Sequence, residues 1–352
     1  MPHHVPEVGQ AIGFERAQSE QDAGVIADLI AEYRLSWEML PDHALKHQEV
    51  WRSLITNKGL PLGALIRQLP RLTKLGLLHP TAELTQVVVD QLTNPVALQK
   101  ARIHPVSVLL ALKTYAAGRS PNPNVRTTWE PSRPVIDALD DAFYKAFKAT
   151  KPTGKRIRLA LDVSGSMGNG ISGTFISARE GSAAMALATA ASESTCDIVG
   201  FCKSGSAPTR SRYSYGYGYG SVGSDLNHRG LSQLKLSPKQ RLDDAVESIT
   251  GLPFGGTDCS LPMTDALEKG LEFDAFVVYT DNETWGGDIH PHQALRRYRE
   301  RTGIDAKLIV VGMTATDFSI ADPDDPNMLD IAGFDSNVPA LISNFIQGNG
   351  NG

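Results

Sequence analysis

A carboxylate and two hydroxyls stand at alternate positions, Asp162, Ser164 and Ser166, directly after a strongly apolar stretch of the chain. Residues 157–161 form a near-continuous apolar run, which predicts a central strand of a parallel sheet covered on both faces. Open α/β sheets bind ligands outside the carboxyl ends of their strands, so we expect the three oxygens to converge there. Hard oxygen ligands without a nearby imidazole or thiolate favour Mg²⁺, Ca²⁺ or Mn²⁺ over zinc or copper.

Two later segments supply further oxygen ligands. Thr257 follows two glycines in a loop before a predicted helix, and Asp281 directly follows the apolar run 276–280. Together with Asp162, Ser164 and Ser166 they give two carboxylates and three hydroxyls, whose formal charge of −2 matches a divalent ion. We expect Mg²⁺ most, with Ca²⁺ or Mn²⁺ as alternatives, and some of the contacts to run through water. Five protein groups leave an octahedral ion at least one open position.

The Asp-x-Ser-x-Ser spacing resembles the metal-ion-dependent adhesion site of von Willebrand factor A domains. The resemblance implies that a carboxylate from a protein partner takes the open position, so that the ion acts as an adhesive. The alternative is a relic site, in which hydrogen bonds hold the same residues together without an ion.

Strands and helices alternate from Arg156 onward, which predicts a doubly wound α/β domain around this site. Before it, from Asp22 to about Lys148, helical periodicity with short Gly- and Pro-marked connections predicts roughly three HEAT-type repeats of about 40–47 residues. We therefore expect a flexible N-terminus at 1–20, helical repeats at 21–150 and a von Willebrand factor A-like domain at 151–352. The first expected helix starts at about 22 and includes 25–30. The other expected helices are 42–59, 62–75, 81–92, 95–103, 105–117, 133–149, 178–194, 238–250, 260–270, 291–301 and 338–347, and the expected strands are 156–162, 197–202, 273–280 and 306–311.

Composition narrows the class of protein. The hydrophobic fraction of 41% allows a substantial core, and the three cysteines show neither a CxxC spacing nor a paired framework, which suits a reducing compartment. The N-terminus has no signal-peptide pattern, and no stretch approaches 18 uninterrupted apolar residues. These features predict a soluble cytoplasmic protein without a membrane partner.

Charge is distributed unevenly along the chain. Residues 1–155 hold 18 Lys and Arg against 15 Asp and Glu, whereas residues 156–352 hold 16 against 24. Within 42–126 the balance is 11 basic to 4 acidic residues. A basic first part beside an acidic second part suggests a polyanion-binding arm joined to a metal-binding domain, and the alternative is an ordinary solvated helical surface.

Two basic groups are candidates for binding RNA. Arg67, Arg71 and Lys74 share one helix face if Pro70 does not kink or restart that helix, with leucines on another face. The second group lies around the helix start at Pro105, where helix N-termini and guanidiniums both suit phosphate. Its members are Lys100, Arg102, His104 and Lys113. Without an aromatic-rich RNA-binding motif, any RNA binding should be led by phosphate and shape, and should be salt-sensitive.

A Ser/Gly/Tyr-rich segment at 204–235 interrupts the α/β pattern. Its tyrosines could stack on single-stranded bases, and the alternative is a flexible surface insertion.

Several stretches resemble the Ro autoantigen or TROVE-domain ribonucleoproteins, in that family's order. The matching segments are 49–51, 62–77, 100–105, 142–145, 152–156, 255–263, 280–284 and 320–326. The resemblance implies helical repeats that form part of a ring or horseshoe closed by the von Willebrand domain. It also implies binding of small noncoding Y RNAs or misfolded RNA, in RNA quality control and without a catalytic step. Members of the family carry further helical repeats upstream of the matched part, so we expect an open arc, an oligomer, or a second chain that completes the ring.

Three functions therefore compete. The first is a noncatalytic RNA-binding protein with a metal-dependent partner site, and the second is a metal-dependent protein–protein adaptor without RNA binding. The third is a metal-dependent hydrolase or nuclease. We do not expect an enzyme, because only Glu283 lies near the site as a general base and one ion suits two-metal phosphoryl chemistry poorly.

Overall fold

The chain forms two compact units, Met1–Ala149 and Thr150–Gly352, in a computed structural model. The structure describes residues 7–149, 151–202, 230–237, 239–250, 257–281, 287–314 and 320–348. Each unit is described below by itself. Within the described residues no helix is long and apolar enough to span a membrane.

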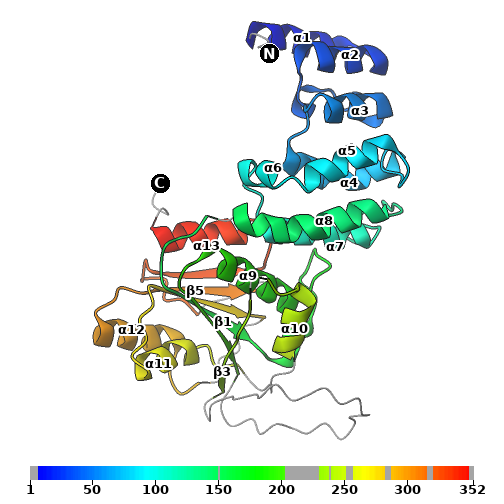
Figure 1. Cartoon of the computed structure of the whole chain (residues 1–352). Coiled ribbons are helices and arrows are strands. Elements are labelled where there is room, and N and C mark those ends of the chain that lie inside the picture. The colour runs from blue at the N-terminus through cyan, green and yellow to red at the C-terminus, as the bar shows by residue number, and fades with distance from the viewer. Residues whose placement is uncertain are drawn as a thin grey trace, which may run out of the picture. The chain divides into compact units, whose positions relative to one another are not determined.

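The first unit is a stack of paired helices with short connections (Figure 1). Its α-helices are α1 (Glu7–Ser19), α2 (Ala23–Tyr33), α3 (Gln48–Thr56), α4 (Leu62–Lys74), α5 (Glu83–Leu92), α6 (Pro95–Lys100), α7 (Pro105–Ala116) and α8 (Arg133–Ala146). Short 3₁₀ turns are η1 (Trp37–Met39), η2 (Ala44–Lys46) and η3 (Phe147–Ala149). Neighbours in sequence pack against each other, as α2 does on α3 and α7 on α8.

Local sequence signals explain where these helices start. Asp22 caps α2, since its side chain accepts hydrogen bonds from the backbone N–H groups of Gly24 and Val25. Asn94 caps α6 in the same way, and Pro95 occupies the first helical turn, where a missing N–H costs nothing. The expected helix starts at Asp22 and Pro95 are therefore confirmed within a residue.

Two expectations for the first unit are wrong. The lead-in at 1–20 was expected to be poorly ordered, but Glu7–Ser19 forms α1, which packs on α2. Pro70 was expected to kink or restart its helix, and the restart is wrong, because α4 runs through Pro70 as one helix. The buried leucines of α4 keep packing on the core across that position, and this tertiary contact outweighs the lost backbone hydrogen bond.

The second unit is built on a twisted, mainly parallel sheet. Its described strands are β1 (Ile157–Asp162), β2 (Cys196–Phe201), β3 (Leu231–Gln233), β4 (Ala275–Thr280), β5 (Lys307–Gly312) and β6 (Met328–Ala332), in the spatial order β3-β2-β1-β4-β5-β6. Only the edge strand β3 among these runs antiparallel, against β2. All residues of β1 and β4 are buried, which explains their continuous apolar runs.

Helices cover both faces of this sheet (Figure 1). They are α9 (Ala178–Ser192), α10 (Leu242–Thr250), α11 (Leu261–Glu268), α12 (Pro291–Thr302) and α13 (Val338–Gln347), with a 3₁₀ turn η4 (Gly165–Gly168) after β1. Helices α11 and α12 pack together over alternate residues of the central strands, where Met263 and Leu295 meet Phe276 and Val278 in one apolar cluster. Helix α9 packs against α10 and contacts β1 and β2.

Two strands were not expected from the sequence. Strand β3 lies near the end of the segment interpreted as an insertion at 204–235, so that segment contributes an edge to the sheet. Strand β6 follows an Asp- and Pro-rich stretch and has two half-buried positions, which weakens its apolar signal. Residues 203–229, which include most of the Tyr/Gly-rich segment, lie outside the described residues.

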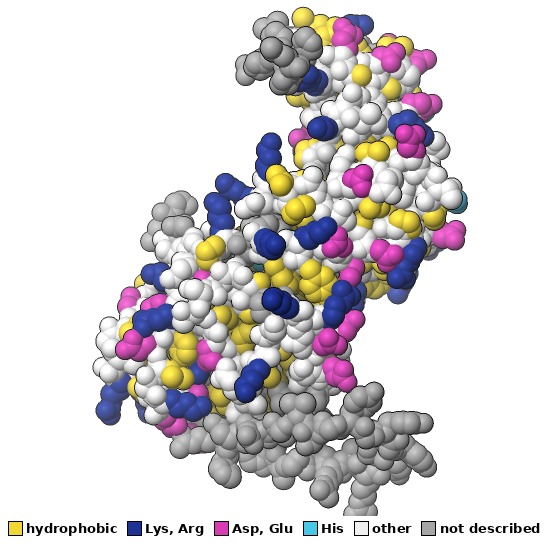
Figure 2. Space-filling view, in the orientation of Figure 1, with side chains coloured by type: hydrophobic (Ala, Val, Ile, Leu, Met, Phe, Trp, Pro, Cys, Tyr) yellow, Lys and Arg dark blue, Asp and Glu magenta, His cyan; other side chains and the backbone are white. Residues whose placement is uncertain are grey.

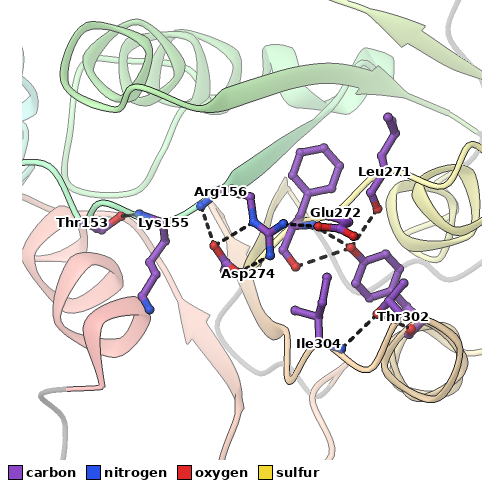
Figure 3. A network of polar contacts seen from close by, with 10 residues as sticks. Thr153, Lys155, Arg156, Leu271, Glu272, Asp274, Thr302 and Ile304 are labelled. Carbon is purple, nitrogen blue, oxygen red and sulfur yellow. Dashed lines mark hydrogen bonds and ion pairs between the residues drawn. The ribbon is translucent and has the colours of Figure 1, made fainter.

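The two central strands are tied together at their amino ends. Figure 3 shows Arg156 reaching Asp274 and Glu272, with Nη2 at 2.8 Å from Asp274 Oδ1. One position into β1, Arg158 is buried, with its side chain only 1% exposed. Its Nη1 lies 2.8 Å from Asp265 Oδ2 on α11, and its Nε lies 2.6 Å from Asp197 on β2. This buried ion pair network connects the sheet to the helix that follows the Thr257 loop.

Candidate metal centre and basic helix face

Asp162 stands at the carboxyl end of β1, with its residue fully buried. Its Oδ1 accepts the backbone N–H of Ser164 at 2.8 Å. Its Oδ2 accepts the hydroxyls of Thr257 at 2.9 Å and Thr280 at 2.8 Å. Burial raises the pKa of the Asp162 carboxyl above its ordinary value, and the hydrogen bonds it accepts oppose that rise. The carboxylate is therefore oriented by three separate segments of the chain.

The two serines lie in the turn that follows. Ser164 Oγ and Ser166 Oγ are 3.1 Å apart, a hydrogen-bond distance. The 3₁₀ turn η4 sets this spacing, and its buried Met167 anchors the turn in the core. Ser164 is almost fully buried and Ser166 is exposed, so the hydroxyl pair reaches from the carboxylate towards solvent.

Asp281 is the first residue after β4, and β4 pairs with β1. Leu161 is in register with Tyr279, so the chain ends its two central strands side by side. Connections from β1 lead to β2 on one side of the sheet, and β4 continues to β5 on the other. This reversal of strand order is where open α/β sheets form their ligand crevice. Asp281 is buried there, and its carbonyl accepts the hydroxyl of Thr314.

The loop that presents Thr257 is stabilised by its neighbour. Asp258 is buried, and its Oδ1 accepts the backbone N–H of Ser260 at 3.0 Å and the Ser260 hydroxyl at 2.6 Å, just before α11. Gly287 passes so close that a Cβ there would lie 2.3 Å from Asp258 Oδ1. A side chain at position 287 would therefore displace the carboxylate that braces the Thr257 loop.

Two residues of this centre escape sequence reasoning. Thr280, the last residue of β4, reads as an ordinary β-branched strand position, yet its hydroxyl binds Asp162. Arg179, in the first turn of α9, donates from Nη2 to the Ser164 carbonyl at 2.8 Å. Its position at the start of the helix after the Asp-x-Ser-x-Ser turn was the available signal.

The donor chemistry fits a hard divalent cation. Within the described residues Asp162 forms no ion pair, so a buried carboxylate lacks a bound counter-charge beyond the nearby Arg179. The hydroxyls of Ser164, Ser166 and Thr257 add neutral oxygen donors, and Asp281 supplies the second carboxylate at the same sheet edge. Among the described residues no cluster of three or more His, Cys, Asp or Glu side chains suited to a metal occurs, so a cation at this centre would depend on hydroxyl oxygens besides the two carboxylates. Glu283, the general-base candidate, lies outside them.

Helix α4 of the first unit has a basic face and an apolar face. Arg67, Arg71 and Lys74 are exposed, and Leu65, Leu69 and Leu72 are fully buried. The Arg71 guanidinium lies 5.8 Å from the ring centre of the buried Trp51, which holds that cation near the helix surface. In Figure 2, Lys and Arg side chains on the visible face are interspersed with Asp and Glu. The cations of α4 are therefore a local group, and the molecular surface around them is of mixed charge.

The second basic group is only partly cationic. Lys100 and Arg102 are exposed on and just after α6, and Lys113 on α7 is half-buried and already engaged in an interaction. His104 instead caps α7, as its Nδ1 accepts the Val106 N–H at 3.2 Å. Burial lowers the pKa of His104 to about 4, so the ring is neutral at pH 7 and brings no charge to a phosphate. His104 stays a predicted RNA contact, but one that a neutral ring would make.

The turn that follows α6 lies close to the start of α4. Gly63, one turn before Arg67, leaves room for the turn after α6, because a Cβ there would lie 3.4 Å from Ile103 Cδ1. The same Cβ would lie 3.8 Å from Arg67 Nη1. Arg102 directly precedes Ile103 in this turn. The turn after α6 therefore packs closely against the start of α4, one helical turn before Arg67.

Comparisons with known proteins agree with these two units. Residues 32–118 match the family model of the TROVE domain, and residues 156–215 and 221–346 match that of the Ro60 vWA domain. RNA-binding protein RO60 of Caenorhabditis elegans is 39% identical over 336 residues, covering 95% of this chain and 47% of that protein. RNA-binding protein RO60 of Deinococcus radiodurans is 38% identical over 339 residues, covering 96% of this chain and 58% of that protein.

A solved structure gives the same result. The crystal structure of the Deinococcus radiodurans RO (RSR) protein superposes with a TM-score of 0.80 at 36% identity, covering 99% of this chain and 65% of that one. This chain thus spans about half the length of the curated relatives it matches. The predicted resemblance and the predicted fold class, helical repeats followed by a von Willebrand factor A domain, are confirmed. The chain therefore belongs to the Ro60 family of TROVE- and vWA-domain proteins.

Proposed function

We propose that this chain is a noncatalytic RNA-binding protein whose helical unit contacts RNA phosphates through Arg67, Arg71, Lys74, Lys100 and Arg102. The observation that carries the proposal is the exposed basic face of α4, set opposite a fully buried leucine face. Relatives named RNA-binding protein RO60 support the choice of RNA as the polyanion. The RNA class we propose is small structured noncoding RNA of the Y type, or misfolded RNA.

Phosphate contact dominates in this proposal. Cations on one helix face neutralise phosphates without reading base edges, so affinity should fall steeply as salt rises. A helical surface without an RNA-recognition sheet suits structured RNA, which is bound largely through shape and backbone. The neutral His104 contributes by ending the α6–α7 turn at a fixed geometry, which positions Arg102 two residues earlier.

The second unit is proposed to hold a divalent cation, most readily Mg²⁺, through Asp162, Ser164, Ser166, Thr257 and Asp281. Such an ion, when bound, supplies an electrophilic position for a carboxylate of a protein partner. The residues of this chain hold Asp162 in place through Thr257 and Thr280, and Arg179 fixes the carbonyl of the serine turn. We propose that this centre serves partner binding, separately from RNA binding by the helical unit.

Gel shifts test the RNA proposal directly. The full chain is titrated against a structured noncoding RNA hairpin at about 50 and about 200 mM salt. The proposal predicts binding at the lower salt and a loss of at least about tenfold in affinity at the higher. Absence of binding at the lower salt would leave the metal-dependent protein adaptor as the better reading of this chain.

A further inference from the structure

Three cations of the helical unit have a backbone conformation that usually belongs to glycine. Among the described residues, the non-glycine residues with positive φ are Arg34 (φ 53°), Lys58 (φ 59°) and Arg102 (φ 53°). In this left-handed region Cβ comes too close to the following carbonyl oxygen, so an L-residue is strained there and glycine is not. Each of the three positions nevertheless holds a long basic side chain, and all three residues are exposed.

The same hydrogen-bond motif ends the helices α2, α3 and α6 at these cations. The residue after each cation donates its N–H to a carbonyl five residues earlier, which is the Schellman ending, and its left-handed position is usually glycine. Helix α4 ends in the same way with Gly76 (φ 74°) at that position. This unit therefore uses glycine at one such ending and a cation at three. The donor–acceptor pairs at the three cationic endings are Leu35–Ile30, Gly59–Leu54 and Ile103–Leu98, at 3.3, 2.8 and 3.1 Å.

A favourable interaction with the carboxyl end of a helix does not require the strained position. A cation in the last helical turn gains the same interaction at ordinary helical dihedrals. Helix α6 already has Lys100 in its last turn, and Arg102 still follows in the left-handed conformation. The last turns of α2 and α3 hold no basic residue, so at Arg34 and Lys58 an experiment has to separate the two roles. Strained backbone of this kind clusters at functional sites.

Arg34 and Lys58 lie at helix ends that contact each other. The Trp37 N–H donates to the Gly59 carbonyl at 3.1 Å, and a Cβ on Gly59 would lie 2.5 Å from the Leu35 carbonyl oxygen. Leu35 directly follows one cation and Gly59 directly follows the other. With consecutive Cα atoms about 3.8 Å apart, the two cationic residues have Cα atoms within roughly 14 Å of each other. A single strand of a polyanion can therefore reach both side chains.

No internal partner neutralises this pair of cations. Among the described residues, neither the Arg34 guanidinium nor the Lys58 ammonium forms an ion pair or a hydrogen bond. Glu32 and Glu38 are the acidic residues nearest to Arg34 in sequence, and both are exposed and form no ion pair with the described residues. Cations whose N–H donors are unused suit phosphate, which accepts hydrogen bonds from guanidinium and ammonium groups alike.

We propose that Arg34 and Lys58 together bind backbone phosphates of one RNA strand, an inference that rests on the proposed RNA-binding function. The pair is a second contact zone, contributed by the ends of α2 and α3 in addition to the α4 face. Because both cations contact phosphate and no base, the zone binds without regard to sequence and is weakened by salt. The left-handed backbone is the strain that the fold accepts to keep cations at these two endings.

Substitution by glycine separates the strain from the charge. In the full chain, the double variant Arg34→Gly, Lys58→Gly should melt about 2–4 °C above the wild type, because glycine adopts positive φ without strain. Its affinity for the structured RNA hairpin at about 50 mM salt, measured by fluorescence anisotropy, should fall about tenfold. The slope of log affinity against log salt should become shallower by about 1–2, from two lost phosphate contacts.

Two further variants of Arg34 and Lys58 serve as matched controls. The double glutamine variant removes both charges but keeps a strained side chain, so it should lose the same affinity without the rise in melting temperature. The exchange variant Arg34→Lys, Lys58→Arg keeps both charges and should keep the wild-type slope. A glycine variant that retains the wild-type slope, or that melts no higher than the wild type, would overturn the inference.

The failure of this inference differs from that of the proposed function. If the wild type does not bind the hairpin at about 50 mM salt, both fail. If the wild type binds and only the variant Arg67→Gln, Arg71→Gln, Lys74→Gln has a shallower slope, the inference fails and the proposed function stands. If only the glycine variant has a shallower slope, RNA binds at the ends of α2 and α3 and the proposed contacts of α4 fail.

Discussion

The hydroxyl of Thr257 donates a hydrogen bond to Asp162 Oδ2 at 2.9 Å, across 95 positions of sequence. Thr280 donates to the same oxygen at 2.8 Å, and the Ser164 N–H binds the other. The carboxylate is therefore oriented by the protein before a cation arrives. A preorganised ligand lowers the ordering cost of metal binding. Removal of a single exposed hydroxyl should therefore lower the affinity for the ion without disturbing the fold.

Ser166→Ala tests that expectation. Ser166 is exposed and its hydroxyl hydrogen-bonds Ser164, so its loss removes one oxygen donor without opening a cavity. We predict that Mn²⁺ affinity, measured by electron paramagnetic resonance, falls about tenfold. The free energy of unfolding in EDTA should change by less than about 0.5 kcal/mol. Ser172→Ala, an exposed serine six residues later, is the control, and equal Mn²⁺ affinities for the two variants would contradict the prediction.

Arg158→Met should destabilise the second unit severely. The substitution keeps much of the side-chain volume but removes the guanidinium from Asp197 and from Asp265, which is 10% exposed and keeps only the exposed Lys269 as a partner cation. Removal of one partner from a buried ion pair costs about 3–5 kcal/mol, because the remaining charge stays desolvated. Urea unfolding of the full chain, followed by a probe in the second unit, measures the change.

Arg156→Met is the matched comparison for that variant. Arg156 lies two residues before Arg158 and forms ion pairs with Asp274 and Glu272, but 36% of its side chain is exposed (Figure 3). Solvent screens this pair, so the loss should be near 1 kcal/mol. If Arg156→Met proved as destabilising as Arg158→Met, burial would not be the cause of the difference.

His104 should make the stability of the first unit depend on pH. Burial lowers its pKa from 6.5 to about 4, so between these values the unfolded chain binds a proton that the folded chain does not. Stability is complete above pH 6.5 and falls as the pH drops towards 4, by up to about 3 kcal/mol. Melting temperatures from pH 7.5 to 4.5 measure this, and the slope should be reduced in His104→Asn, whose amide can accept the same capping bond without titrating. Parallel curves for the two proteins would contradict this role.

The sequence predicted the second unit well where burial is symmetric. Ile157–Asp162 and Ala275–Thr280 lie within the expected strands, because a strand covered on both faces is apolar throughout. The edge strand Leu231–Gln233 was missed, since a three-residue strand paired on one side leaves little pattern. The helix through Pro70 was misjudged because tertiary packing decided it.

The residues of the proposed metal centre could be named from the sequence, whereas the residues that support them could not. Thr257 and Asp281 could be chosen from the sequence because each lies at the end of a recognisable loop or apolar strand. The roles of Thr280 and Arg179 depend on which strand pairs with β1 and on where α9 begins, and these are properties of the fold. For His104 the residue type alone was misleading about charge. Histidine suits phosphate when it is protonated, but this ring caps α7 and its pKa is lowered to about 4 by burial.

The central proposal is that the basic face of α4 binds RNA phosphates. The triple variant Arg67→Gln, Arg71→Gln, Lys74→Gln removes its three cations and leaves the buried leucines untouched. The control, Arg296→Gln, Arg297→Gln, Arg301→Gln, makes the same charge change on exposed positions of α12 in the other unit. Circular dichroism melting of both variants confirms that each unit is folded before RNA is added.

The decisive measurement is the slope of log affinity for a structured RNA hairpin against log salt, for the wild type and these two variants. We predict that the α4 variant binds more weakly at low salt and that its slope is shallower by about 2–3, one counterion or somewhat less for each lost phosphate contact. The α12 variant should keep the wild-type slope. Identical slopes for all three proteins would contradict RNA binding through the helical unit.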